Sequence, residues 1–248
     1  MSTTPSPANK VALVTGANKG IGLETVRQLA KEGVVVYLGA RDEKKGTDAA
    51  KSLRDEGYDV RFVPLDVTSQ ASLAAAAKRV ESDFGRLDIL VANAGIAEWG
   101  IKASEEGLDV WRRVFDTNVY GLVATSQAFL PLIRKSEAGR IVHLTSILGS
   151  LSLIGDPKSP VGATAGQGAA YAASKSAVNM FTVQLAAELK GTKIKVNAAH
   201  PGWVKTELGG EGAMLELPDG AKTSVALALL PSDGPTGKYI HLGNELPW

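Results

Sequence analysis

The sequence contains no cysteine and only three histidines. Without thiols the chain has no disulfide bond, no thiolate metal ligand and no cysteine nucleophile. His143, His200 and His241 are scattered along the sequence without the spacing of a metal-binding motif. We therefore expect these histidines to serve in packing or at the surface, and we predict no metal site.

Charge of one sign and long hydrophobic runs are missing as well. The 27 Lys and Arg residues nearly balance the 26 Asp and Glu residues, and no basic block could follow a nucleic-acid backbone. Residues 1–9 are rich in Ser, Thr and Pro without a signal pattern, and the apolar run after them is too short to span a bilayer. We expect a disordered lead-in over residues 1–9, a cytoplasmic protein, and neither nucleic acid nor membrane as a partner.

The rest of the chain alternates short β-branched runs with longer segments rich in alanine and charge. This alternation is typical of βαβ units that build a parallel sheet. The expected strands are Lys10–Thr15, Val34–Gly39, Val60–Leu65, Leu87–Ala92, Arg140–Thr145, Lys193–Ala199 and Gly237–His241. The expected helices are Ile21–Glu32, Glu43–Glu56, Gln70–Phe84, Leu108–Lys135, Ala169–Lys190 and Ala221–Leu229.

These elements predict one α/β domain over residues 10–248. Its 44% hydrophobic and 21% charged residues are ordinary for a globular core. Strands that are apolar throughout, such as residues 34–37, indicate a sheet covered on both faces. We therefore expect a doubly wound parallel seven-stranded sheet in three layers, a Rossmann fold. Ligands of such folds bind beyond the carboxyl ends of the strands, where the strand order reverses.

A glycine-rich turn follows the first expected strand and leads directly into a helix. It reads Thr-Gly-Ala-Asn-Lys-Gly-Ile-Gly over residues 15–22. Glycines permit a tight turn and a close backbone approach, and the N–H groups and dipole at a helix start attract a pyrophosphate. The turn is therefore a candidate dinucleotide site.

The pattern of this turn resembles the cofactor turn of the short-chain dehydrogenase/reductase family. The resemblance implies cofactor contacts from the turn residues Gly16, Asn18, Lys19, Gly20, Ile21 and Gly22. Asn93-Ala94-Gly95, after the fourth expected strand, resembles the family's second motif, which steadies the sheet, although Ala92 stands where Asn is more usual. Asp66 and Val67 follow the third strand, and Asp66 matches the acidic position that in the family contacts adenine.

The end of the second strand bears on the choice between NAD and NADP. An acid at this point accepts from the ribose hydroxyls of NAD and would repel a 2′-phosphate. By the resemblance, Ala40 takes the place of that acid, and Arg41 follows as a planar cation suited to a phosphate. Lys19 would add a second cation, so NADP(H) is the expected cofactor. The alternative is that a shifted strand end brings Asp42 to the ribose.

Tyr171 and Lys175 stand four residues apart, which places both side chains on one face of a helix. A phenol has a reference pKa of about 10, and a nearby ammonium favours its ionised form. This pair resembles the family's catalytic pair, with Tyr171 exchanging the proton and Lys175 holding the ribose and lowering the Tyr171 pKa.

The same resemblance supplies companions for this pair. Ser146 matches the serine that holds the substrate oxygen, with Thr145 as a less favoured substitute, and Asn118 matches an asparagine that helps hold a water beside the lysine. The segment from Pro201 and Gly202 to Thr206 resembles the one that grips the nicotinamide carboxamide through the Val204 backbone and the Thr206 hydroxyl.

The chain departs from the family between Ser146 and Tyr171, an interval of 25 residues that exceeds the usual spacing by about a dozen. The added length, Leu153–Gly168, is expected to be a loop that shapes one wall of the substrate pocket. Glu207–Asp219 is expected to be a mobile substrate loop. The apolar side chains Trp99, Ile147, Leu148, Leu153 and Trp203 suggest a hydrophobic carbonyl compound, although core packing would account for at least two of them.

The predicted function is NADPH-dependent reduction of a ketone or aldehyde, with Tyr171 as proton donor and a homodimer or homotetramer as the expected assembly. One alternative is an oxidoreductase acting on a sugar, steroid or fatty-acyl carbonyl. Another, from a different class, is a non-catalytic NADP-binding regulator that kept the fold and lost the chemistry.

Overall fold

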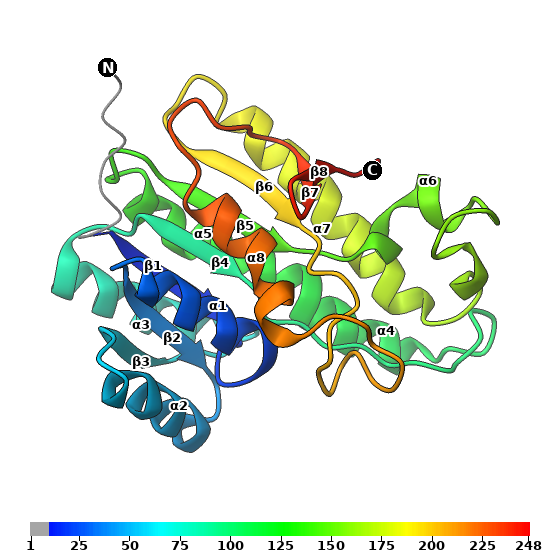
Figure 1. Cartoon of the computed structure of the whole chain (residues 1–248), viewed down its shortest axis with the longest axis horizontal. Helices are drawn as coiled ribbons and strands as arrows, with labels where there is room; N and C mark the ends of the chain where they lie inside the picture. The colour runs from blue at the N-terminus through cyan, green and yellow to red at the C-terminus, as the bar shows by residue number, and fades with distance from the viewer. Residues whose placement is uncertain (1–9) are drawn as a thin grey trace.

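The computed structural model describes residues 10–248, so the expected lead-in over residues 1–9 lies outside the described residues. The chain builds one eight-stranded sheet with the order β3-β2-β1-β4-β5-β6-β7-β8 (Figure 1). Its strands are β1 (Val11–Thr15), β2 (Val35–Ala40), β3 (Val60–Pro64), β4 (Ile89–Ala92), β5 (Arg140–Leu144), β6 (Lys195–Ala199), β7 (Tyr239–His241) and β8 (Asn244–Glu245). The strand order reverses between β1 and β4.

The seven predicted strands are the parallel ones, and β8 is an addition that pairs antiparallel with β7. Leu242 and Gly243 form the two-residue connection, with φ of 45° and 84°. A two-residue hairpin with positive φ at both positions normally carries Asn or Asp followed by Gly. Because Leu242 takes the first position, the usual sequence signal for this hairpin was absent.

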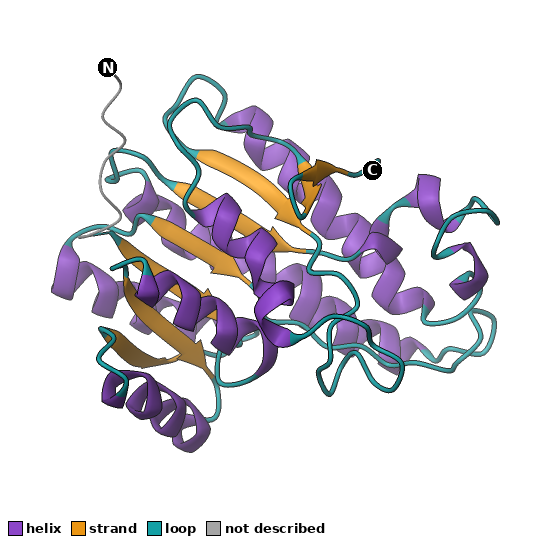
Figure 2. Cartoon of the chain, viewed as in Figure 1, coloured by secondary structure: helices purple, strands orange, loops and turns teal. Residues whose placement is uncertain are grey.

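Helices cover both faces of the sheet and make the three predicted layers (Figures 1 and 2). One face carries α1 (Gly20–Lys31), α2 (Glu43–Asp55) and α8 (Leu217–Ala228), and the other carries α3 (Gln70–Phe84), α5 (Gly121–Ile133) and α7 (Ala169–Glu188). Within β1, Val11 and Leu13 pack into the core under α3, α5 and α7, whereas Ala12 and Val14 pack into the core under α1 and α8. Successive side chains of a strand point to opposite faces, so a strand between two helical layers is apolar throughout.

Three of the expected elements differ in the structure. Helix α8 begins at Leu217, four residues before its expected start and inside the segment Glu207–Asp219 that was expected to be a loop. The single helix expected over 108–135 is divided into α4 (Leu108–Phe115), a π-helical segment (Asp116–Tyr120) and α5. The expected loop Leu153–Gly168 is partly helical, since it includes the end of α6 (Leu151–Ile154) and a short 3₁₀ turn at Gly162–Thr164. Short π-helical insertions occur often at functional sites. Within residues 10–248, no helix has the length and apolarity that a membrane crossing requires.

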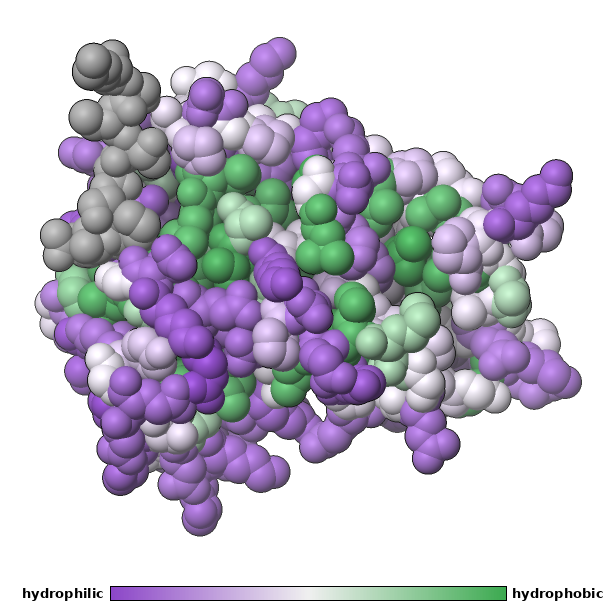
Figure 3. Space-filling view, viewed as in Figure 1, coloured by the Kyte–Doolittle hydropathy of each residue, from purple (hydrophilic) through white to green (hydrophobic). Residues whose placement is uncertain are grey.

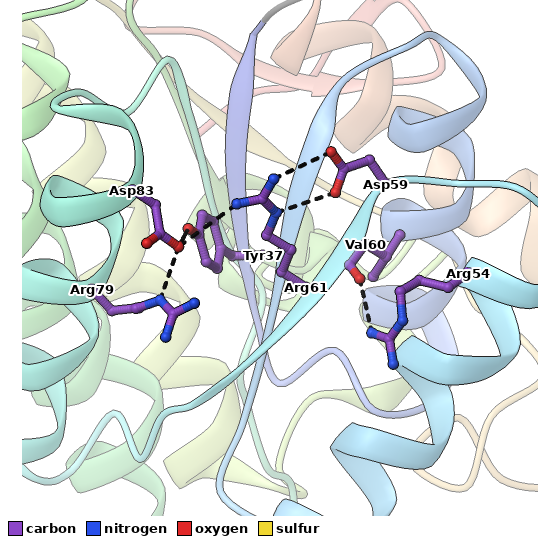
Figure 4. A network of polar contacts seen from close by, with 7 residues as sticks. All are labelled: Tyr37, Arg54, Asp59, Val60, Arg61, Arg79 and Asp83. Carbon is purple, nitrogen blue, oxygen red and sulfur yellow. Dashed lines mark hydrogen bonds and ion pairs between the residues drawn. The ribbon is translucent and has the colours of Figure 1, made fainter.

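A polar network holds α3 against the β2–β3 edge of the sheet (Figure 4). The Tyr37 hydroxyl from β2 donates to Asp83 Oδ2 of α3, which also accepts from Arg79 Nε at 2.8 Å. Arg61 of β3 lies 3.7 Å from the same carboxylate and pairs with Asp59. Burial, followed by the bond to Asp83, raises the pKa of Tyr37 to about 12. Three of the predicted cofactor contacts, Arg41, Asp66 and Val67, follow the carboxyl ends of β2 and β3 at this edge.

Candidate active site

One cleft of about 1600 Å³ runs along the carboxyl ends of the parallel strands, across the reversal of strand order between β1 and β4. It brings together almost every residue that the sequence assigned to the site. Those lining it are Gly16, Asn18, Lys19, Gly20, Ile21, Gly22, Arg41, Asp66, Val67, Asn93, Ala94, Gly95, Ser146, Tyr171, Lys175, Pro201, Gly202, Val204 and Thr206. Asn118 is the exception, because its side chain is fully buried behind the cleft wall.

The glycine-rich turn packs closely against the end of β4. Gly16 has a φ of 62°, and a Cβ built on it would stand 2.9 Å from Ala94 Cα. A Cβ on Gly22 would stand 2.5 Å from Asn93 Nδ2, so a side chain at either position would displace the turn. Helix α1 begins at Gly20 with no side-chain cap and no acidic residue in its first turn. Its first N–H groups are therefore free of side-chain acceptors and suited to an anion.

Asn93 joins β4 to this turn. Its Nδ2 donates to the carbonyl of Thr15 at 2.8 Å and to that of Gly16 at 3.2 Å. The Thr15 hydroxyl in turn accepts from the backbone N–H groups of Asn93 and Ala94, each at 3.1 Å. Asn93 thus holds the glycine turn in place through three hydrogen bonds, and Ala94 adds a fourth between the two parallel strand ends.

The two acids near the adenine end are oriented by local hydrogen bonds. Asp42 Oδ1 accepts from Lys45 N at 2.9 Å and caps α2, so its carboxylate serves the helix instead of the cleft. Asp66 Oδ1 accepts from the N–H and the hydroxyl of Thr68 at 2.9 and 2.7 Å. These bonds hold the pKa of Asp66 below its ordinary value. Arg41 lies at the cleft directly after β2, with Asp66 close enough to interact electrostatically.

Lys19 lies in a setting that the sequence did not predict. Its ammonium forms an ion pair with Glu207, on the loop that follows β6, and both side chains are well exposed. The pair joins the glycine turn to the loop after β6 along the rim of the cleft. Glu207 carried no recognisable motif, and it meets Lys19 only because the ends of β1 and β6 share one edge of the sheet.

Ser146, Tyr171 and Lys175 come together below the end of β5. A hydrogen bond with Ser146 acts on the buried Tyr171 phenol, and Lys175 Nζ lies 5.5 Å from the centre of the Tyr171 ring. Lys175 Nζ donates to the carbonyl of Leu144 at 2.9 Å. The predicted proximity of the phenol, the amine and the hydroxyl is therefore present in the structure.

The pKa values in this group differ from the expectation. Burial raises the pKa of Tyr171 to about 12, and the bond with Ser146 only partly opposes this. Burial also lowers the pKa of Lys175 to about 8. Desolvation disfavours a charged group of either sign, which is why the phenol and the amine shift in opposite directions. The helical spacing alone had suggested that Lys175 would lower the Tyr171 pKa. Burial instead dominates that pKa and raises it.

Asn118 lies in the π-helical segment, and its side chain is fully hydrogen-bonded. Oδ1 accepts from Ile96 N at 2.8 Å, and Nδ2 donates to Ile96 O at 2.9 Å and to Ser174 Oγ at 3.0 Å. A Cβ built on Gly95 would lie 3.4 Å from Asn118 Oδ1 and 3.6 Å from Lys175 Nζ. Asn118 and Lys175 thus flank the same small space, although Asn118 does not reach the cleft.

The sequence missed two residues that support this group. Glu106, buried before α4, accepts at Oε2 from Ala170 N at 2.8 Å, next to Tyr171 at the start of α7. His200 Nδ1 accepts from Ile147 N at 3.3 Å and from Gly202 N at 3.4 Å. Burial lowers the pKa of His200 to about 3, so the imidazole is neutral and can accept. Glu106 offered no sequence signal, and His200 offered only its place immediately before Pro201.

The far end of the cleft is lined by apolar side chains, many of them from the segment between Ser146 and Tyr171. Ile147, Leu148, Trp99 and Trp203 line it as expected, but Leu153 does not. Other lining residues from the added segment include Ile154, Pro160, Val161, Ala163 and Ala165. Hydrophilic residues crowd the α2 end of the face in Figure 3, whereas hydrophobic residues are more frequent toward the α6 end. Within residues 10–248, no cluster of three or more His, Asp or Glu side chains could hold a metal ion.

Comparison with known proteins agrees with this architecture. The family model described as short chain dehydrogenase matches residues 10–213. The chain is 34% identical to carbonyl reductase (NADPH) 1 of Mus musculus, over 98% of this chain and 100% of that protein. It is 31% identical to (+)-neomenthol dehydrogenase of Capsicum annuum, over 94% and 96% of the two chains.

A solved structure gives the same result. The NADPH-bound carbonyl reductase from chicken fatty liver superposes with a TM-score of 0.85 at 30% sequence identity, covering 97% of this chain and 100% of that one. The extent of the family match and the coverage of these relatives confirm the resemblance read from the glycine turn and the Tyr171–Lys175 pair. The chain therefore belongs to the short-chain dehydrogenase/reductase family of oxidoreductases.

Proposed function

We propose that this protein reduces a ketone or aldehyde with NADPH, and that Tyr171 supplies the proton. The observation that carries the proposal is the buried group of Tyr171, Ser146 and Lys175 at the edge of a cleft long enough for a dinucleotide. Two relatives support reduction with NADPH. One is named carbonyl reductase (NADPH) 1, and the other is a carbonyl reductase with NADPH bound.

The cleft residues fit a nicotinamide dinucleotide. The uncapped start of α1 suits the pyrophosphate, and Asp66 suits the adenine. Arg41 at the cleft suits a 2′-phosphate, and Asp42, whose carboxylate caps α2, does not line the cleft. Lys19 could bind the same phosphate as Arg41 only if its ion pair with Glu207 broke. When bound, the reduced nicotinamide supplies the hydride that the carbonyl carbon receives.

The protein's own groups account for the rest of the reaction. Ser146 orients the substrate oxygen toward Tyr171, whose high pKa keeps the phenol protonated at neutral pH. The phenol O–H then donates its proton to that oxygen as negative charge develops there. Lys175, still mostly charged at pH 7, holds the ribose. The proton that Tyr171 gives up is replaced from solvent, by way of Lys175 and the small space that it shares with Asn118.

The apolar far end of the cleft supports a hydrophobic carbonyl substrate over a sugar. Burying apolar substrate surface there contributes about 25 cal/mol per Å². Sugar hydroxyls would lose water and find few partners, since Thr164 and Gln167 are the polar side chains that the added segment brings to the lining. The added segment between Ser146 and Tyr171 forms one wall of this end. The cytoplasmic location and the dimeric or tetrameric assembly stay predictions.

The test replaces Tyr171 with Phe and follows NADPH absorbance with a panel of ketones, with NADH measured in parallel. We expect a loss of about 10²-fold or more in kcat, with NADPH binding retained when measured by fluorescence. Tyr58→Phe is the matched control, because Tyr58 lies outside the cleft lining. Full turnover by the Tyr171→Phe enzyme would refute the assigned role, and NADH preferred over NADPH would refute the cofactor.

A further inference from the structure

Trp99 lies on the connection between β4 and α4 and packs directly against Tyr171. The two ring centroids are 4.9 Å apart, with the ring planes at 64° in an edge-to-face arrangement. Tyr171 is only 8% exposed, whereas Trp99 is 46% exposed and lines the cleft. The indole therefore has one part against the phenol and another part open to the cleft.

Two further segments hold Trp99 in this position. Trp99 Nε1 donates to the carbonyl of Leu208, on the loop after β6, at 3.1 Å. Gly168, at the end of the added segment, has a φ of 60°, and a Cβ built there would stand 3.0 Å from Trp99 Cε3. A side chain at Gly168 would therefore push the indole away. Three connections that are distant in sequence meet at this one ring.

We propose that Trp99 determines substrate specificity: its indole covers Tyr171 from water and offers a flat apolar wall against which the ring of an aromatic ketone packs. The substrate part of this inference rests on the proposed function, whereas the covering of Tyr171 does not. Nothing in the motifs around Tyr171 required an aromatic residue at position 99.

The chemistry at this end of the cleft favours such a partner. Two of the charged residues that line the cleft, Arg41 and Asp66, stand at the ends of β2 and β3. Glu207, next to Leu208, is paired with Lys19, and the apolar Ile147 and Leu148 line the cleft as Trp99 does. Aromatic rings prefer edge-to-face or offset contacts with one another, and such contacts add to the free energy of plain burial. A ketone that carries an aromatic ring therefore gains from Trp99 what an aliphatic ketone of the same size does not.

The first arm of the test needs no enzymatic activity. Tetranitromethane nitrates exposed tyrosines, and mass spectrometry reports Tyr171 relative to Tyr120, which is 62% exposed. We expect Trp99→Ala to raise the relative nitration rate of Tyr171 at least about 5-fold, and Trp99→Phe to leave it within about 2-fold because a ring remains. Trp203→Ala is the matched control, since Trp203 is a half-exposed indole in the same cleft. Equal rates in Trp99→Ala and wild type would overturn the covering role.

The second arm compares two ketones of equal heavy-atom count, acetophenone and cyclohexyl methyl ketone. We expect Trp99→Ala to lower the ratio of their kcat/KM values, aromatic over aliphatic, by about 5-fold, and Trp99→Phe to restore most of it. A ratio unchanged by Trp99→Ala would overturn the specificity role. A wild-type enzyme that reduces neither ketones nor aldehydes would refute the proposed function and the specificity role together, while the nitration rates would still decide whether Trp99 covers Tyr171.

Discussion

Replacing Asn118 with Leu should unfold the protein more readily, because this side chain holds the connection after β4. The substitution keeps the size of the side chain and removes three hydrogen bonds, two to the backbone of Ile96 and one to Ser174 Oγ, of 2.8 to 3.0 Å. Each bond contributes about 1 kcal/mol net, and each buried partner left unpaired costs about 1–3 kcal/mol.

The expected loss in the free energy of unfolding is about 3–5 kcal/mol. Ile96 is only partly buried, so water can replace some of the lost bonds and the lower half of this range is favoured. For a chain of this size, each kcal/mol lowers Tm by about 2–4 °C, so the melting temperature should fall by roughly 6–15 °C. Urea titration at 25 °C and scanning calorimetry measure the two quantities.

Asn244→Leu is the matched control, since Asn244 is exposed on β8 and should change stability by no more than about 0.5 kcal/mol. A double-mutant cycle with Ser174→Ala should give a coupling energy of about 1 kcal/mol with Asn118→Leu. A loss below about 1 kcal/mol for Asn118→Leu would refute the reasoning, because three hydrogen bonds, one of them fully buried, cannot all vanish at so small a cost.

Three further outcomes follow from the site and its support. Arg41→Ala should raise the KM for NADPH about 10- to 100-fold, since a hydrogen bond to a charged group contributes about 1.5–3 kcal/mol. An equal rise in the KM for NADH, which has no 2′-phosphate, would contradict a role of Arg41 in phosphate binding. The pKa of Lys175 is lowered to about 8. The kcat/KM for NADPH should therefore fall as the pH rises through about 8, because the ammonium is lost. A kcat/KM that stays constant up to pH 9.5 would argue against Lys175 holding the cofactor as a cation. Arg140 is buried, and its guanidinium donates to the carbonyls of Gly139, Lys193, Leu230 and Pro231. Arg140→Met should therefore lower Tm by about 10 °C, which thermal unfolding by circular dichroism would measure, and an unchanged Tm would show that these carbonyls find other partners.

The lowered pKa of Lys175 also predicts that the free energy of unfolding increases with pH above about 8. An unfolded chain keeps Lys175 protonated up to about pH 10.5, whereas the folded chain loses that proton near pH 8. The penalty for burying the charge is therefore complete below pH 8 and is relieved as the pH rises from 8 toward 10.5. Lys175→Met should remove this part of the pH dependence of unfolding.

The glycine turn and the helix face shared by Tyr171 and Lys175 could be predicted from the sequence, because each depends on residues that are close together in the chain. The turn over residues 15–22 needs glycine for its backbone and a helix directly after it, and both are visible in the chain. Tyr171 and Lys175 share a helix face because a helix turns every 3.6 residues. The continuous apolar strands predicted a covered sheet, and alternate residues of β1 do enter two different cores.

Contacts between distant segments could not be predicted in this way. Glu106 caps α7 across 64 residues, and Lys19 meets Glu207 across 188. The pKa of Tyr171 was expected to fall beside Lys175, yet it rises, because burial outweighs an amine at this distance. No pattern along the chain states how deeply a side chain will be buried.

The sequence by itself determined the fold class and the glycine turn, since these follow from periodicity and turn chemistry. It also placed Tyr171 and Lys175 on one helix face, while the roles of Tyr171, Lys175 and Ser146 are what the family resemblance implies. Only the tertiary structure decided the pKa values of those groups. It also decided that the Asn118 side chain forms hydrogen bonds with the backbone of Ile96 and that Trp99 packs against Tyr171. The reason is physical: desolvation and packing depend on every segment that closes over a residue, and in this chain those segments lie far apart in the sequence.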